Sequence, residues 1–89
     1  LNAAAELMEQ GRFEESAAAN ARIIEKHPNI MLAYNNRGYN YMQLNKLELA
    51  IADFNAALKL SPAYITYNNR GTTILRKVYH AGALTQFST

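Results

Sequence analysis

Two nearly identical polar stretches are the first candidates for chemistry in this sequence. Ala33–Gly38 reads AYNNRG, and Thr66–Gly71 reads TYNNRG. Each copy presents two adjacent carboxamides and a guanidinium. A carboxamide has an acceptor oxygen and two N–H donors, so it can pair with the C=O and the N–H of a peptide backbone. A guanidinium pairs with a carboxylate through two parallel hydrogen bonds. These residue types therefore indicate recognition of another chain by hydrogen bonding.

Catalytic and metal-binding chemistry finds little support in the sequence. Cysteine is absent, which excludes thiolate nucleophiles, disulfides and Cys-based metal sites. His27 and His80 lie in different segments, and neither has a second metal ligand three or four residues away. No glycine-rich phosphate loop and no Ser, His and Asp set can be assembled. We therefore expect no enzyme, no metal site and no cofactor.

Helical periodicity runs through the whole chain, and the alternation typical of strands is missing. Gly11, Pro28 and Asn45 mark expected turns, since Pro in particular cannot continue a helix. Ser61 is expected to be an N-cap, with Pro62 at the first helical position. The expected helices are 1–10, 13–26, about 30–44, about 47–60 and about 62–77, with a weaker sixth to the end. Turns of two to four residues make each helix antiparallel to its predecessor.

These helices follow a regular sequence period. Pro28 returns as Pro62, and Gly38 returns as Gly71. A period in this range indicates stacked supersecondary units. The spacing within residues 31–64 resembles that of the tetratricopeptide repeat, a helix-turn-helix unit of about 34 residues. The residues that carry the resemblance are Tyr34, Gly38, Tyr41, Ala50, Phe54, Ala57 and Pro62.

The resemblance implies an all-α fold. We expect a single domain over residues 1–89, in which antiparallel helix pairs stack into a right-handed α-solenoid. Repeat 1 spans about 1–30 and repeat 2 about 31–64. Repeat 3 spans about 65–89 and is truncated or degenerate.

Close packing inside each repeat is the expected role of the small signature residues. Gly in a helix costs about 1 kcal/mol relative to Ala, so a Gly that returns at one phase implies a contact that offsets the cost. Arg37 departs from the family pattern, which usually has Leu there, and Asp53 is its expected ion-pair partner. Arg70 has Gln86 in the equivalent place. Because Gln cannot neutralise it, Arg70 is expected to look outward toward an acidic neighbour.

A second stripe, offset from the core-facing positions, is the candidate binding surface. Stacked pairs form a concave surface made mainly of the first helix of each pair. Packed helices lie roughly 8–10 Å apart, and three extended residues cover about 10 Å. We hypothesise that Asn36 and Asn69 clamp an extended partner segment at every third peptide unit. The candidate groove residues are Asn35, Asn36, Tyr39, Met42, Gln43, Asn68, Asn69, Thr72 and Arg76. The same stripes contain Ala5, Met8, Glu9, Leu32, Ile65 and Leu75.

This arrangement resembles the asparagine ladder of tetratricopeptide superhelices such as the O-linked N-acetylglucosamine transferase family. The alternative is that the asparagines are only solvated or bond to the neighbouring helix. The carboxylate clamp of co-chaperones that bind heat-shock protein tails fits poorly, because only Asn36 stands at a matching position.

A protein or peptide is therefore the expected partner. The net charge of +2 is too small to argue for nucleic acid, and an RNA-binding helical repeat would need a stronger basic stripe. Self-association through exposed terminal repeats is the second functional class. The charge runs from −2 up to Pro28 to +3 after Pro62, which favours either head-to-tail contact between copies or an acidic ligand near the C-terminal unit.

Nothing in the sequence indicates a membrane or a secretory signal. No apolar run approaches the about 18–20 residues of a membrane span, and residues 1–20 carry four Glu where a signal peptide would be basic. We expect a cytoplasmic protein without a membrane segment. The sequence begins at Leu1, so the alternative that it is a fragment whose targeting signals lie elsewhere stays open.

Overall fold

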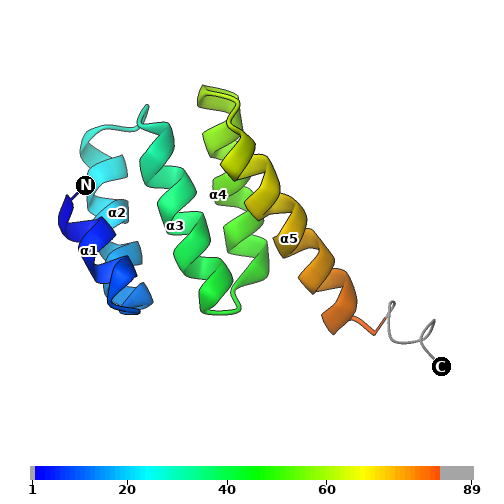
Figure 1. The fold of residues 1–89 in the computed structure, drawn as a ribbon. Coiled ribbons are helices and arrows are strands. Elements are labelled where there is room, and N and C mark those ends of the chain that lie inside the picture. The colour runs from blue at the N-terminus through cyan, green and yellow to red at the C-terminus, as the bar shows by residue number, and fades with distance from the viewer. Residues whose placement is uncertain (1, 83–89) are drawn as a thin grey trace.

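Five helices make up the described part of the chain, and each turns back on its predecessor (Figure 1). The computed structural model describes residues 2–82. The helices are α1 (Asn2–Glu9), α2 (Phe13–Lys26), α3 (Met31–Gln43), α4 (Leu47–Leu60) and α5 (Tyr64–His80). Each helix packs against the next one along the chain, and no strand occurs among the described residues. The all-α architecture of stacked helix pairs is therefore confirmed.

The turns after α1 and α3 share one design. Gly11 and Asn45 adopt left-handed backbones, with φ of 77° and 62°. The next residue then reaches back: the N–H of Arg12 bonds to the C=O of Leu7 at 2.9 Å, and Lys46 bonds to Tyr41 at 2.8 Å. This pattern closes a helix C-terminus, and Gly and Asn are the residues that adopt it most readily. The two turns stand at the same position of successive repeats, as the period requires.

The start of α5 differs from the expectation. Ser61 does not cap α5 but follows the end of α4, where its N–H bonds to the C=O of Ala57 at 3.0 Å. Pro62 is outside the helix, and α5 begins at Tyr64 after an extended Ala63. Ser61 and Ala63 are both extended, so the link between α4 and α5 is longer than we expected. The prediction of Ser61 as an N-cap and Pro62 as the first helical residue was wrong.

The end of α5 also differs, because the helix runs to His80 rather than to about Lys77. Val78 stands at the position that the left-handed Asn45, which follows the end of α3, holds one repeat earlier. A β-branched residue strongly disfavours positive φ, so the turn is not made and the helix continues. The next left-handed residue is Gly82, with φ of 84°. The sixth helix, expected from about Tyr79 to the end, lies mostly in residues 83–89, outside the described part, and its first expected residues, Tyr79 and His80, belong to α5.

The apolar core lies between α3 and α4. Phe54, Ala50 and Met42 form a buried cluster, against which Tyr39 and Tyr41 pack. Gly38 faces the Phe54 ring so closely that a Cβ at this position would lie 2.7 Å from a ring carbon. The absence of a side chain at Gly38 is therefore what lets the ring seat against α3.

Polar side chains replace part of this core in the first repeat. Ser16 and Asn20 occupy the places that Ala50 and Phe54 hold one repeat later, and both are fully buried. Ser16 Oγ donates to the C=O of Ala4 at 2.7 Å and accepts from Asn40 Nδ2 at 2.8 Å. Asn20 Nδ2 donates to the C=O of Ser16 at 3.1 Å. Hydrogen bonds thus join α1, α2 and α3 where an aromatic ring joins α3 and α4.

A bidentate ion pair reinforces the second repeat. Arg37 Nε donates to Asp53 Oδ2 at 2.8 Å, and Arg37 Nη2 donates to Asp53 Oδ1 at 2.7 Å. The Asp53 side chain is 7% exposed and the Arg37 side chain 22%. The hydrogen bonds to Asp53 raise the pKa of Arg37 above its ordinary value. Because this pKa is raised, deprotonation of Arg37 does not remove the contribution of the pair to stability at any pH below the ordinary arginine value.

Substitution of the close-contact glycine is expected to destabilise the chain. The Gly38→Ala side chain would overlap the buried Phe54 ring, and overpacking costs about 1–3 kcal/mol. The gain of about 1 kcal/mol in helix propensity offsets this only in part. Urea denaturation followed by circular dichroism measures the change. Gly71→Ala is the matched control, because nothing described lies within 4 Å of a Cβ there, and its midpoint should be unchanged or higher. A Gly38→Ala midpoint equal to that of Gly71→Ala would contradict the close-contact account.

Removal of the Asp53 charge is expected to lower the free energy of unfolding by about 1–3 kcal/mol, since hydrogen bonds to charged groups are worth about 1.5–3 kcal/mol. Thermal unfolding of Asp53→Asn measures the loss. Glu15→Gln removes a similar pair with Arg12, whose side chains are both more than half exposed, and should leave the unfolding temperature unchanged because exposed pairs contribute little. Equal shifts in the two variants would show that burial adds nothing to the Arg37–Asp53 pair.

Candidate functional site

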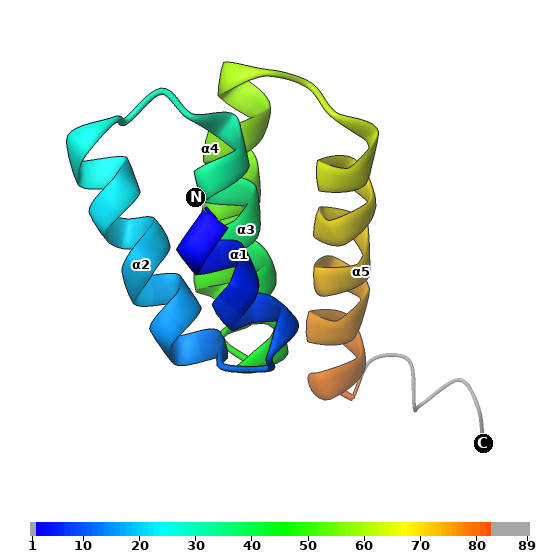
Figure 2. The same cartoon turned by 60° about the vertical axis from the view of Figure 1, so that its left-hand side comes forward.

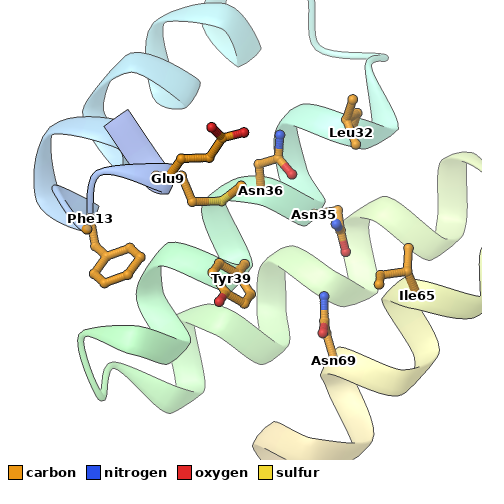
Figure 3. A pocket seen from close by; sticks show the side chains of 10 residues that line it. Glu9, Phe13, Leu32, Asn35, Asn36, Tyr39, Ile65 and Asn69 are labelled. Carbon is orange, nitrogen blue, oxygen red and sulfur yellow. The ribbon is translucent and has the colours of Figure 1, made fainter. Parts of the chain in front are cut away.

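The first helices of successive pairs, α1, α3 and α5, line one hollow of about 620 Å³ (Figure 3). Five of its ten lining residues are apolar or aromatic, and carboxamides stand among them. Glu9 is the one charged residue that lines the hollow among the described residues. The lining residues are Met8, Glu9, Gly11, Phe13, Leu32, Asn35, Asn36, Tyr39, Ile65 and Asn69. We call this hollow the groove.

The structure brings Asn36 and Asn69 into the groove from different helices. Figure 3 shows the two carboxamides directed into the hollow, Asn36 from α3 and Asn69 from α5. Both residues are half-buried. Neither carboxamide hydrogen-bonds to another residue of the described part of the chain. Each therefore keeps its acceptor and its donors available for a ligand.

Asn35 differs from its neighbour Asn36. It is only 6% exposed, and its Oδ1 accepts a hydrogen bond from Thr66 Oγ1 at 2.9 Å. Asn35 lines the groove wall, but its oxygen is already used to hold α5 against α3. The alternative that an asparagine bonds to the neighbouring helix therefore applies to Asn35 and not to Asn36 or Asn69.

The structure places the remaining predicted groove residues elsewhere. Met42 is in the core, because it follows Gly38 by one turn and shares the face that α4 covers. Gln43 and Asn68 are exposed and do not line the groove. Thr72 and Arg76 line a second hollow, of about 440 Å³, with Leu75, Tyr79 and His80. Arg76 also donates to the C=O of Met42 at 3.1 Å, which fastens α5 to the end of α3.

Phe13 and Gly11 are lining residues that the sequence reasoning missed. Gly11 lies in the turn between α1 and α2, and Phe13 is the first residue of α2. The predicted binding stripe, in contrast, ran along the first helix of each pair. The Phe13 ring meets the Tyr39 ring edge to face, with centroids 6.3 Å apart and an interplanar angle of 67°. Such pairs stabilise by about 0.5–1.5 kcal/mol beyond their buried area. The presence of an aromatic residue, Phe13, two positions after Gly11 could have indicated that this turn contributes to the groove.

A comparison with protein families bears on this architecture. The family model described as tetratricopeptide repeat matches residues 1–65. The chain belongs to the tetratricopeptide repeat family. The match covers α1 to α4 and the first residues of α5, so the family and the helical repeat solenoid expected from the sequence are confirmed. No curated protein and no solved structure matches the chain significantly.

Membership of this family sets the general kind of activity. Tetratricopeptide repeats are non-catalytic scaffolds that generally mediate protein–protein interactions. Within residues 2–82, no group of three or more His, Cys, Asp or Glu could hold a metal ion. None of the described helices is both long enough and apolar enough to cross a membrane.

Loss of the Thr66 hydroxyl is expected to loosen the groove wall. Thr66→Val keeps the side-chain shape but leaves the buried Asn35 Oδ1 without its donor, which costs about 1–3 kcal/mol. Urea denaturation measures this as a lower midpoint. Thr72→Val is the matched control, since Thr72 is exposed on the same helix. If the two variants unfold at the same urea concentration, the Asn35–Thr66 bond does not hold α5 in place.

Proposed function

We propose that this chain is a protein–protein interaction module that binds an extended segment of a partner protein in the groove of α1, α3 and α5. The observation that carries the proposal is the pair Asn36 and Asn69. These two equivalent carboxamides come from successive repeats, line one hollow and lack hydrogen bonds to the described protein. Half-buried amides without protein partners are satisfied by water, which a ligand can displace.

Backbone recognition is the proposed role of the two asparagines. Each carboxamide can accept from a backbone N–H and donate to a backbone C=O. Helices that pack side by side lie roughly 8–10 Å apart, and three residues of extended chain span about 10 Å. Asn36 and Asn69 would thus hold the ligand backbone at two points about three residues apart, without selecting its side chains.

Side-chain selection would come from the apolar wall. Leu32 and Ile65 offer aliphatic surface, and the Phe13 and Tyr39 rings offer aromatic surface at the α1 end of the groove. Glu9 favours a basic residue of the ligand near α1. Among the described residues the groove contains no Lys or Arg, which supports a protein ligand over RNA because RNA binding relies on cations. Self-association stays an alternative prediction from the sequence.

The experiment is a selection of peptides from a random displayed library, followed by titration of the selected peptides. Asn36→Ala combined with Asn69→Ala is expected to weaken binding by about tenfold or more, since each hydrogen bond is worth about 0.5–1.5 kcal/mol and a tenfold change is about 1.4 kcal/mol. Asn68→Ala is the matched control, because Asn68 is exposed and outside the groove. Unchanged affinity in the double variant would refute the clamp.

A further inference from the structure

The face of α3 that receives α4 has a defined chemistry. Gly38 provides the gap that the Phe54 ring fills. Beside it, Arg37 pairs with Asp53. The Tyr34 and Tyr41 rings flank the guanidinium, with centroids 6.0 Å and 5.8 Å from its carbon. An aromatic residue preceded by a carboxylate is thus the feature of α4 that fits α3.

The next helix pair begins with the same face on α5. The counterparts of the four α3 residues of that face, one repeat later, are Tyr67, Arg70, Gly71 and Ile74. Tyr67 is 49% exposed and Ile74 44%. Among the described residues, nothing lies within 4 Å of a Cβ built on Gly71. Residues 2–82 therefore leave the α5 copy of the helix-receiving face open, whereas α4 fills the α3 copy.

The cation on this face lacks a carboxylate. Arg70 lies over the Tyr67 ring at 5.4 Å, as Arg37 lies beside its tyrosines. Its hydrogen-bond partner is the neutral Asn55 Oδ1 at 2.8 Å, and no ion pair of Arg70 occurs within residues 2–82. α5 contains no Asp or Glu; of its cations, Arg76 donates to the C=O of Met42 and Lys77 pairs with Glu48 at 3.5 Å, so Arg70 is the cation of this face. The open face of α5 is therefore positively charged, whereas Asp53 neutralises the equivalent cation on the filled face of α3.

Among residues 2–82, only α4 and α3 make substantial contact with α5. Figure 1 and Figure 2 both show α5 at the end of the helix row, with other helices on one side only. The apolar stripe continues along the helix from Tyr67 past Gly71 and Ile74 to Val78, with the spacing of one helix face. A stripe of this length matches the packing face of a partner helix of three or four turns.

We propose that this face of α5 docks an amphipathic helix of a partner protein that carries a carboxylate directly before a large aromatic residue. The aromatic ring fills the gap over Gly71, and the carboxylate pairs with Arg70. Small residues one turn to either side let the two helices approach, as Ala50 and Ala57 do in α4. A second copy offering its own α5 would bring cations against cations, which disfavours pairing through two such faces. This surface lies apart from the groove and does not depend on the proposed groove function.

A peptide with the sequence of α4, residues 47–60, is the probe, because α4 has the required pattern. The labelled peptide is titrated with the whole chain, and fluorescence anisotropy reports binding. We expect saturable binding that weakens at least fivefold for the Asp53→Asn peptide and is lost for the Phe54→Ala peptide. No binding of the unmodified peptide, or equal binding of all three, would overturn the proposal.

Two variants of the chain locate the peptide on α5. Gly71→Leu fills the gap and is expected to abolish binding. Arg70→Asp is expected to weaken binding at least fivefold, and an Asp53→Arg peptide should recover most of it by restoring opposite charges. The Asn36→Ala and Asn69→Ala double variant should bind the peptide like the unmodified chain, which separates this surface from the groove. Wild-type affinity in Gly71→Leu would overturn the assignment to α5.

Two further results would assign another occupant and overturn the proposal. If Gly71→Leu lowers the urea midpoint of the isolated chain, the face is covered by residues 83–89 of the chain itself. If sedimentation gives a mass of two chains that Gly71→Leu halves, the occupant is a second copy. We expect a mass of one chain for both proteins and a midpoint for Gly71→Leu at or above that of the unmodified chain.

Discussion

The contact between the Phe54 ring and the backbone at Gly38 sets the spacing of α3 and α4. A ring can seat against a helix only where no Cβ intervenes, so one glycine defines how near the two axes come. That distance brings Arg37 within bidentate reach of Asp53 and buries Ala50. It also turns the opposite side of α3, with Asn36, toward α1 and α5. The groove is thus a consequence of packing on the far side of the same helix.

The first helix pair solves the same packing problem with polar groups. Hydrogen bonds of Ser16 and Asn40 take the place of the contact between the Phe54 ring and Gly38. Hydrogen bonds constrain both distance and angle, whereas packing of a ring depends mainly on the space available. The solution is incomplete, because the Oδ1 atoms of Asn20 and Asn40 are buried without a partner among the described residues. Each unpaired buried acceptor has an energetic cost. The hydrogen bonds between α1, α2 and α3 therefore fix how these helices pack, at a cost in stability.

Sequence reasoning succeeded where one residue decides a local structure. Gly11, Pro28 and Asn45 end helices through backbone chemistry, so the bounds of α2 and α4 were predicted as found. It failed where the outcome depends on neighbours in space. The sequence offered both Asn35 and Asn36 as groove residues, and it could not show that Asn35 is tied to the neighbouring helix by the hydrogen bond from Thr66. The extension of α5 was foreseeable in principle, because a β-branched residue replaces Asn at the turn.

The way α1 is held has a consequence for the groove that it helps to line. This helix is held by the buried Ala4 and the bond from Ser16 to its carbonyl. Elements with few tertiary ties open below the global unfolding free energy. Amide hydrogens of α1 should therefore exchange with solvent ahead of those in α3, and occupancy of the groove at Met8 would be thermodynamically linked to their protection.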